Sequence, residues 1–338
     1  MANVANYPFC TIDPNVGVVE VPDERLSKLT EMVSPEKVIP ATVEFVDIAG
    51  LVKGASKGEG LGNKFLANIR QCNAIAMVVR IFEDGNIIHV HGGLDPKRDI
   101  EIIETELILA DLETIDKRFS KAKSDSKSGN SKLIAYGELL GRLKSHLESG
   151  KIAHDFSASK EEKESLNDLH LLTNKPFLFI ANVHENEITK CGHEYLADKL
   201  KVAKNAEIIP ISAKIEEELA QMSPEEAKVF LDDLGLKEPG LYALIRSAYK
   251  VLGYMTFFTA GPQEVRAWTT DIGATAPKAA GVIHTDFERG FIAAEVISYK
   301  DYVECGGELK AKEKGKVRIE GKEYIIQDGD IVHFRFNV

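Results

Sequence analysis

Two short segments near the N-terminus carry residues suited to binding a metal ion and a phosphate. Residues 43–46 form an apolar, β-branched run that predicts a buried strand, and Asp47 follows directly as the start of an Asp-x-x-Gly pattern that ends at Gly50. Upstream, Thr11 closes the segment Tyr7-Pro8-Phe9-Cys10-Thr11. Carboxylate and hydroxyl oxygens suit Mg²⁺, and a glycine lets its backbone N–H approach a phosphate with no Cβ in the way. We therefore expect Thr11 and Asp47 to hold Mg²⁺ beside a phosphate contact at Gly50; the alternative for Asp47 is an aspartate that caps a turn.

A second pattern, Asn182-Val183-His184-Glu185, follows another apolar strand, at the position where a guanine-reading site carries Asn-Lys-x-Asp. Guanine is read by a short carboxylate that accepts two parallel N–H bonds, and Glu185 is one methylene too long for that geometry. Val183 replaces the lysine whose stem covers the base. A site that has lost its polar match to one base loses selectivity by orders of magnitude. Asn182 can still pair with the N6 and N7 edge of adenine, so the pattern predicts ATP rather than GTP.

Other residues are expected to complete this site. Ser212-Ala213 stands where the last base-contacting loop would be, and Phe82 either stacks on adenine or packs in the core. Gly54, Gly58, Gly60 and Gly62 follow Asp-x-x-Gly rather than a strand-to-helix turn. They therefore favour a second switch segment that moves with phosphate contacts over a dinucleotide loop.

The sequence contains no Gly-x-x-x-x-Gly-Lys-Ser/Thr, the loop that cradles nucleotide phosphates. A near match at residues 13–18 has Val18 where the lysine must stand. From ordinary strand, loop and helix lengths we expect this loop and its strand to precede Met1 by about 25 residues. The groups that remain are acidic or neutral and would bind a tetra-anion poorly. A non-catalytic binding module is therefore an alternative to an enzyme for the chain as written.

Short apolar runs separated by helical patterns indicate a mostly parallel sheet covered on both faces. The runs are residues 16–21, 43–46, 75–81, 176–181 and 207–211. Ligands of such sheets bind at the carboxyl ends of the strands, where Asp47, Asn182 and Ser212 all stand. We assign residues 1–94 and 166–255 to this nucleotide-binding domain.

Residues 95–165 interrupt the domain as a helical hairpin. Asp95-Pro96 predicts a helix start, a long charged helix runs to about Lys123, and the polar segment 124–132 predicts an exposed turn. A second helix then repeats apolar residues at three- and four-residue steps, which is typical of a coiled-coil seam: Leu133, Tyr136, Leu140, Leu143 and Leu147. A rigid spacer and a partner-binding arm are both open. Residues 256–338 alternate short apolar stretches with glycine-rich turns and predict a small β-rich domain close to a half-open β-grasp barrel.

The composition narrows the class of protein. The formal charge of −11 argues against indiscriminate nucleic-acid binding. The sequence contains no run of about 18 apolar residues, so no membrane span is expected. Its N-terminus lacks a basic region followed by an apolar one, so a signal peptide is not expected. The four scattered cysteines, Cys10, Cys72, Cys191 and Cys305, favour reduced thiols in a cytosol, and hence a cytoplasmic protein.

One local exception to the acidic balance lies near the C-terminus, at every second position: Lys310, Lys312, Lys314, Lys316 and Arg318. In a strand or hairpin this spacing would put all five on one face, as a contact for RNA. The alternative, which the spacing alone favours, is an edge strand guarded by lysines against aggregation.

Taken together, these motifs resemble the Obg-like ATPase family, the YchF branch of the Obg-related P-loop NTPases, over residues 5–338. The segments that carry the resemblance are Asn6-Tyr7-Pro8-Phe9-Cys10-Thr11, Asp47-Ile48-Ala49-Gly50-Leu51-Val52, Gly58-Glu59-Gly60-Leu61-Gly62-Asn63, Asn182-Val183-His184-Glu185, Phe257-Phe258-Thr259-Ala260-Gly261, Arg266-Ala267-Trp268 and Gly273-Ala274-Thr275-Ala276-Pro277. The family implies a Ras-like P-loop core, a helical insertion and a C-terminal TGS domain. It also implies a Mg²⁺-dependent ATPase that associates with the ribosome, through its large subunit and ribosomal RNA, and not with membranes. With this resemblance, the alternative to an enzyme is a non-catalytic ribosome- or RNA-binding remnant. We expect a monomer.

The resemblance also bears on the attacking water. Leu51 stands where Ras-type GTPases carry a water-orienting glutamine, and leucine can neither donate nor accept a hydrogen bond. The family assigns this task to a histidine that matches His89, whose imidazole can orient a water near neutral pH. The alternative is a histidine packed among Ile87, Ile88 and Val90.

Overall fold

The structure, a computed structural model, describes residues 15–48, 61–83 and 93–337. Contacts divide the chain into two compact units. The first unit holds residues 46–244 together with the described residues up to Gly17, and the second holds residues 18–45 and 245–338. Across the described ranges, no helix is both long and apolar enough to cross a membrane.

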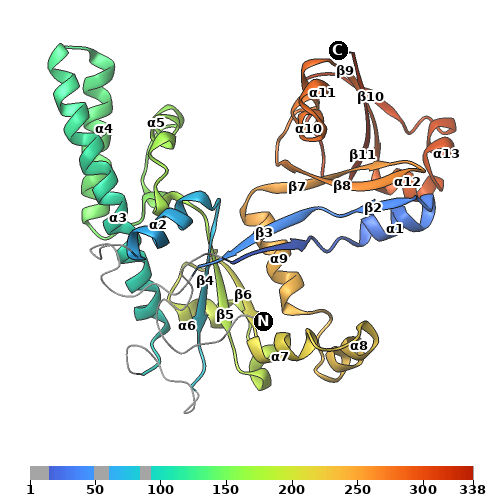
Figure 1. The fold of residues 1–338 in the computed structure, drawn as a ribbon, viewed down its shortest axis with the longest axis horizontal. Helices are drawn as coiled ribbons and strands as arrows, with labels where there is room; N and C mark the ends of the chain where they lie inside the picture. The colour runs from blue at the N-terminus through green and yellow to red at the C-terminus, as the bar shows by residue number, and fades with distance from the viewer. Residues whose placement is uncertain (1–14, 49–60, 84–92, 338) are drawn as a thin grey trace. The chain divides into compact units, whose positions relative to one another are not determined.

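The first unit is built on a parallel sheet with the strand order β4-β5-β6 (Figure 1). β4 (Ile75–Arg80) pairs along its whole length with β5 (Phe177–Asn182), and β5 pairs with β6 (Glu207–Ile211). Four successive residues of β5 are buried, as expected for a central strand covered on both faces. On β4 only alternate residues are buried, and Val78 is 67% exposed. The face of β4 that carries Val78 is therefore uncovered by the described residues.

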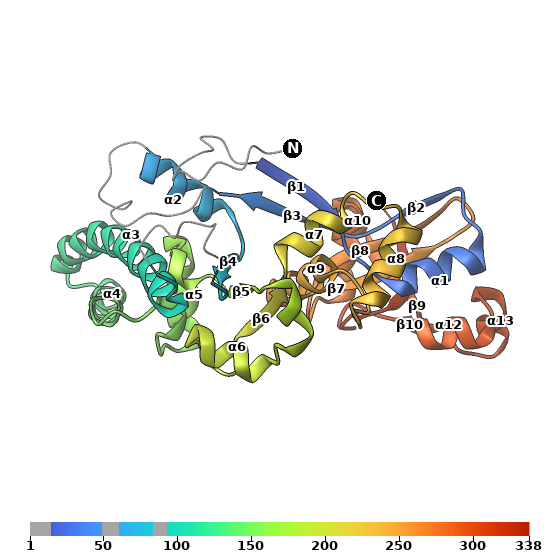
Figure 2. The same cartoon turned by 90° about the horizontal axis from the view of Figure 1, so that it is seen from below.

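Helices cover the opposite face of this sheet. α3 packs on β4 and α6, and α6 packs on β6, with Leu107 of α3 and Leu196 of α6 sharing one apolar cluster with Met77 of β4 (Figure 2). The helices of the unit are α2 (Leu61–Gln71), α3 (Pro96–Asp125), α4 (Ser131–Glu148), α5 (Lys160–Leu166), α6 (His193–Leu200), α7 (Ala213–Leu219) and α8 (Pro224–Asp233), with the short 3-10 helices η2 (Ser126–Ser128), η3 (Ala153–Asp155), η4 (Asn167–Leu169), η5 (Leu172–Asn174) and η6 (Glu185–Lys190).

The sequence prediction of one sheet from all five apolar runs is wrong for the first two. β1 (Asn15–Glu20) and β3 (Thr42–Asp47) form a separate two-stranded sheet. To join this sheet to β4-β5-β6, a further strand would have to pair with both β3 and β4. No strand within the described residues does so. β1 is largely exposed, and its Val16 and Val18 are 57% and 62% exposed.

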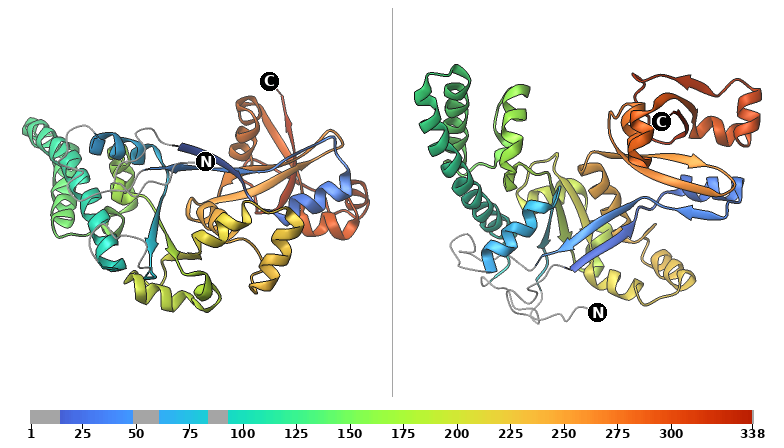
Figure 3. Two further views of the ribbon diagram at one scale, coloured as in Figure 1. Left: turned by 60° about the horizontal axis from the view of Figure 1, so that its bottom comes forward. Right: turned by 45° about the horizontal axis from the view of Figure 1, so that its top comes forward.

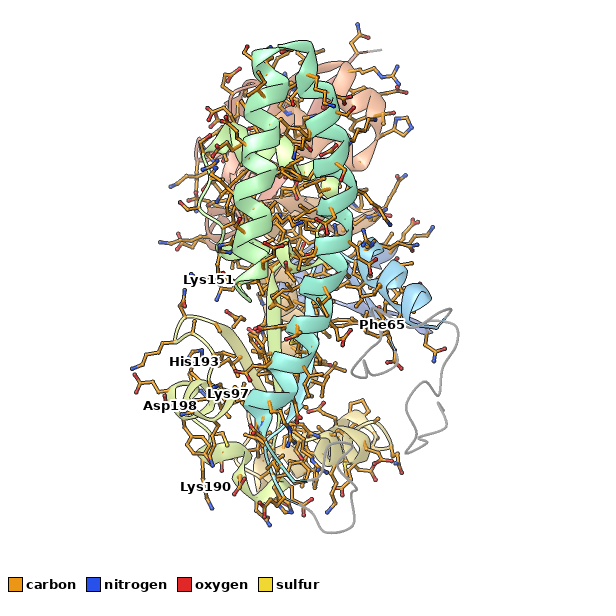
Figure 4. All side chains as sticks on the ribbon, turned by 90° about the vertical axis from the view of Figure 1, so that its left-hand side faces the viewer. Phe65, Lys97, Lys151, Lys190, His193 and Asp198 are labelled. Carbon is orange, nitrogen blue, oxygen red and sulfur yellow. The ribbon has the colours of Figure 1, made fainter. Side chains whose placement is uncertain are left out.

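The helical hairpin forms as the sequence predicts. Asp95 caps α3 by accepting from Arg98 N at 3.1 Å, with Pro96 at the first helical position, and the chain turns through η2 into α4. α3 and α4 lie side by side (Figures 3 and 4). They pack through Ile115, Leu140 and Leu143, which are at most 1% exposed. The predicted seam is confirmed for Tyr136, Leu140, Leu143 and Leu147, whereas Leu133 is not part of this apolar cluster.

One buried carboxylate fixes the hairpin to the segment that leads into β5. Asp111 of α3 is fully buried and accepts from Leu172 N at 2.7 Å, Thr173 N at 2.8 Å and Thr173 Oγ1 at 2.7 Å. Thr173 Oγ1 in turn accepts from Ala153 N at 2.9 Å. Burial raises the pKa of Asp111 above its ordinary value, although these hydrogen bonds oppose the rise.

The second unit contains a six-stranded mixed sheet in the order β10-β9-β11-β7-β8-β2. β7 and β8 form an antiparallel hairpin, and β11 runs antiparallel to β9 and parallel to β7. Phe257 and Phe258 of β7 are fully buried on opposite faces, each in a different apolar cluster. The strands are β2 (Lys37–Ile39), β7 (Tyr254–Ala260), β8 (Glu264–Asp271), β9 (Phe291–Ser298), β10 (Arg318–Glu320) and β11 (Asp330–Phe336), and the helices are α1 (Glu24–Val33), α10 (Ala276–Ile283), α11 (Thr285–Arg289), α12 (Tyr299–Cys305) and α13 (Glu308–Glu313), with α9 (Gly240–Val251) leading in.

Residues 18–45 differ from the expected division, which placed them in the nucleotide-binding domain. β2 adds to the edge of the C-terminal sheet, parallel to β8, and Leu29 of α1 is fully buried in the cluster that contains Phe258. Arg25 Nη1 of α1 lies 2.6 Å from Asp328 Oδ2 in an ion pair, and the Arg25 guanidinium lies over the Phe258 ring. Apolar burial and strand pairing thus bind this early segment to residues 245–338.

The expectation that the period-two basic run forms one strand face is wrong. Lys310 and Lys312 lie in α13, Lys314 ends that helix, Lys316 is in a loop, and only Arg318 lies in a strand. Residues 308–313 form a helix and not a strand because they are strong helix formers and because Ala311 among them is fully buried. Two of the five charges are also engaged in ion pairs: Lys316 with Asp301 at 3.0 Å, and Arg318 with Glu320 at 3.1 Å.

Candidate functional site

Two loops meet at the carboxyl ends of β5 and β6. Asn182, the last residue of β5, is paired in register with Ile211, the last residue of β6, and Val183 N donates to Ile211 O at 2.8 Å. This register places the loop that begins at Asn182 beside the loop that begins at Ser212. The sequence prediction that these two patterns converge is therefore confirmed.

The Asn182 side chain connects the two loops. Its Oδ1 accepts from Ala213 N at 3.2 Å, which leaves the amide NH₂ as a donor. Ser212 is 2% exposed and stands at the N-cap of α7 without a side-chain cap bond. A purine N7 is an acceptor in both adenine and guanine, so this NH₂ suits either base. The sequence argument assigned both polar groups of Asn182 to adenine. Because Oδ1 already accepts from Ala213 N, only its second lone pair remains for an adenine amino group.

The Glu185 carboxylate is paired with a lysine. Lys214 Nζ lies 2.5 Å from Glu185 Oε2, and this hydrogen bond lowers the pKa of the Glu185 carboxyl. Lys214 was not among the site residues expected from the sequence. The sequence feature that could have identified Lys214 is its position directly after Ser212-Ala213, in the first turn of α7.

Val183 and Phe82 occupy different environments. The Val183 side chain is 1% exposed and belongs to the core cluster of the sheet, so it does not take the place of a lysine stem over a base. Phe82 is half-buried and meets the His184 ring edge-on, with centroids 5.8 Å apart. His184 is a second residue that sequence reasoning did not single out, because its ring partner is remote in sequence.

The expected metal and phosphate contacts lie only partly in the described residues. Asp47 ends β3 and is exposed. Thr11, Gly50 and His89 lie outside the described residues. In the described part of the chain no three His, Cys, Asp or Glu side chains cluster as metal ligands. An exposed strand-end carboxylate still fits Mg²⁺, because this ion is commonly held by one or two carboxylates together with substrate phosphates and water.

Comparison with known proteins extends these observations. Residues 1–125 match a family model described as "50S ribosome-binding GTPase", and residues 254–337 match the YchF-GTPase_C model, described as "Protein of unknown function (DUF933)". The "Ribosome-binding ATPase YchF" of Bacillus subtilis is 55% identical over 340 residues, which cover 100% of this chain and 93% of the relative. The protein of the same name from Escherichia coli O157:H7 is 49% identical over 334 residues, covering 99% and 92%. A solved structure, the Schizosaccharomyces pombe YchF GTPase, matches with a TM-score of 0.85 and 37% identity over 98% of this chain and 90% of that chain.

The parallel core, the paired base loops and these matches define an Obg-related P-loop NTPase with a helical insertion and a C-terminal β-rich domain. Within that class the chain belongs to the YchF family and, like the curated relatives that are about half identical to it over its whole length, is an ATPase by family.

Proposed function

We propose that this protein is a Mg²⁺-dependent, ribosome-associated nucleotide switch that binds and hydrolyses ATP in preference to GTP. The observation that carries the base preference is the pair of contacts that closes the base loops, Asn182 Oδ1 with Ala213 N and Glu185 with Lys214. The relatives' names support an ATPase at the ribosome.

The first contact acts on the six-position of the base. Guanine presents an acceptor, O6, there, whereas adenine presents an amino donor. The Ala213 N–H already donates to Asn182 Oδ1, so it is a poor donor for O6. The Asn182 oxygen keeps a second lone pair that an adenine amino group can reach. Adenine therefore keeps its partners where guanine loses one.

The second contact acts on the opposite side of guanine. Recognition of its N1–H and amino group needs a free carboxylate, and Glu185 would have to leave Lys214 to provide one. A site whose polar groups are committed elsewhere rejects the base that requires them. The half-buried Phe82 ring then offers an apolar face for either purine.

Residues near the phosphates have separate expected tasks. Asp47 and Thr11 would hold Mg²⁺, which when bound neutralises phosphate charge and orients the terminal phosphate. The Gly50 N–H would donate to that phosphate, and His89 would orient the attacking water. The lysine and amide cradle for the β- and γ-phosphates would come from an upstream Gly-x-x-x-x-Gly-Lys-Ser segment.

The ribosomal partner is proposed on the relatives' names and on the description of the matching GTPase family, which specifies the 50S subunit. We propose that the large subunit and its ribosomal RNA are contacted by a cytoplasmic monomer, in part through a C-terminal TGS domain. Lys310, Lys312 and Lys314 are exposed there and have no ion pair with a described residue.

The test is a chain extended at Met1 by a strand and a Gly-x-x-x-x-Gly-Lys-Ser loop. Its hydrolysis of ATP and GTP is measured with and without Mg²⁺, and the two kcat/KM values are compared. We expect slow, Mg²⁺-dependent turnover that favours ATP by at least about tenfold. Equal kcat/KM for the two nucleotides would refute the base-selection argument.

A further inference from the structure

The turn of the helical hairpin is strongly basic in an acidic protein. We call residues 117–132 the hairpin tip. This segment contains six basic residues and one acidic residue, a formal charge of +5, in a chain of formal charge −11. Five of the basic residues are exposed lysines: Lys117, Lys121, Lys123, Lys127 and Lys132.

These lysines differ in their ion pairing from Lys97 and Lys144, which also belong to the hairpin. Lys97 pairs with Glu101 at 3.3 Å and Lys144 pairs with Asp116 at 2.5 Å. By contrast, none of the five tip lysines makes an ion pair within the part of the chain that the structure describes. Arg118, the sixth basic residue, is paired with Asp168. Five positive charges thus have no ion-pair partner among residues 15–48, 61–83 and 93–337.

Their placement keeps them away from the hairpin seam. Phe119 and Ala122 pack toward α4, whereas Lys117 and Lys121, one helical turn apart, are exposed on the outside. Lys132 lies in the first turn of α4, a turn that has no acidic residue. A lysine at a helix N-terminus is slightly unfavourable, because both the helix dipole and the side chain are positive there. The tip therefore concentrates positive charge at a cost that an external anion would relieve.

Apart from Asp168, whose carboxylate is paired with Arg118, the acidic bulk of the first unit lies away from the tip. Figure 4 shows the turn at the end of the hairpin opposite Lys97 and Lys151. Ala110 is the last α3 residue in the core cluster of the sheet, and α3 continues to Asp125, about 22 Å further at 1.5 Å per residue. The Debye length at physiological ionic strength is about 8 Å. Repulsion between the acidic body and an anion at the tip is therefore largely screened.

The chemistry of the tip favours a polyanion over a folded protein partner. Protein interfaces depend on buried aromatic or apolar anchors, and no large apolar side chain of the described tip residues is among the exposed ones. Flexible lysines on a projecting turn suit phosphates, which give sequence-independent contacts. We propose that the hairpin tip binds the phosphate backbone of RNA, and that ribosomal RNA is its target. The choice of target rests on the proposed ribosome association.

The experiment uses the full chain with all five tip lysines changed to Gln: K117Q, K121Q, K123Q, K127Q and K132Q. The matched control changes five other exposed, unpaired lysines of the first unit: K151Q, K160Q, K163Q, K204Q and K228Q. Both variants lose the same charge. Binding to deproteinised ribosomal RNA and to purified ribosomes is measured from about 50 to 200 mM KCl. A third variant with all five tip lysines changed to Arg tests for rescue.

We expect the tip variant to bind RNA at least about tenfold more weakly at the lowest salt. The slope of log Kd against log salt should fall by about 2 to 4, since each lost phosphate contact removes about 0.7 to 0.9. The control and the Arg variant should keep the wild-type slope, and circular dichroism should show unchanged helix content in all three.

Several outcomes separate this proposal from the proposed function. The tip proposal would be overturned if the tip variant kept the wild-type RNA affinity and salt slope. It would also be overturned if the variant lost ribosome binding but kept its binding to deproteinised RNA, since the partner would then be an acidic ribosomal protein. RNA binding through the tip without ribosome binding would support the tip and refute only the ribosome association. ATP hydrolysis by the extended chain is measured independently and decides the enzymatic proposal.

Discussion

Lys214 Nζ lies 2.5 Å from Glu185 Oε2, so the carboxylate in the position of a guanine reader is already engaged. Lys214→Met removes the ammonium and keeps an apolar stem of similar length. In the extended chain we expect this change to raise kcat/KM for GTP relative to ATP by about two- to fivefold, because Glu185 becomes free to accept from guanine and an exposed ion pair is worth at most about 1 kcal/mol. Competition between the two nucleotides in steady-state turnover measures the ratio.

Lys190→Met is the control for that prediction, because Lys190 is also exposed but follows the base loop without an ion pair to a described residue. It should leave the ratio unchanged. If Lys214→Met behaves like this control, Glu185 does not limit guanine recognition. Val183→Lys is not a useful companion change, because it would bury an ammonium in the core.

Asp111→Ala should destabilise the first unit by about 3 kcal/mol, because it leaves two buried N–H groups and the Thr173 hydroxyl without their acceptor. Urea unfolding followed by circular dichroism measures the change. Asp116→Ala, on the same helix, is the matched control: its ion pair with Lys144 is exposed and contributes little. Similar losses in both variants would contradict the anchoring role of Asp111.

The stability that Asp111 contributes should depend on pH in a defined direction. Burial raises its pKa in the folded state, so between the unfolded value near 4 and the folded value the native state binds more protons than the unfolded state. The free energy of unfolding therefore falls as pH rises through this window. The difference between wild type and Asp111→Ala should be larger near pH 4 than at neutral pH; a difference that grows with pH would contradict the assignment.

A polypeptide of residues 1–338 alone should bind Mg·ATP poorly, because the sequence offers no lysine and amide cradle for the β- and γ-phosphates. Titration calorimetry measures the affinity. The extended chain should also be more stable to urea, since its added strand can pair with the edge of β4 that no described strand occupies and can place side chains beside Val78, which is 67% exposed. Micromolar affinity in the unextended chain would mean that another phosphate site exists.

His89→Ala in the extended chain should lower kcat and leave ATP affinity nearly unchanged, because a residue that orients water acts on the transition state. Single-turnover hydrolysis and equilibrium binding separate the two effects. Normal turnover in the variant would assign His89 to packing instead.

Local patterns in the sequence were enough for the parts of this protein that depend on neighbouring residues. The helix start at Asp95-Pro96, the seam that contains Leu140 and Leu143, and the strand predicted over residues 176–181 are confirmed, since capping and apolar periodicity are set within a few turns of chain. The convergence of Asn182 with Ser212 also followed, because parallel strands end at one edge of a sheet.

The tertiary structure decided what depends on partners far apart in the chain. Residues 18–45 pack with residues 245–338 because β2 pairs with the edge strand β8 and Leu29 is buried in the same cluster as Phe258. Hydrophobic periodicity does not indicate which distant strand will be the partner. Lys310 and Lys312 lie in a helix and not in a strand, because Ala311 between them is buried against the core of the second unit. Likewise, the sequence gives Glu185 and Lys214 as separate charges, and only the fold, by placing the ends of β5 and β6 together, makes them a pair.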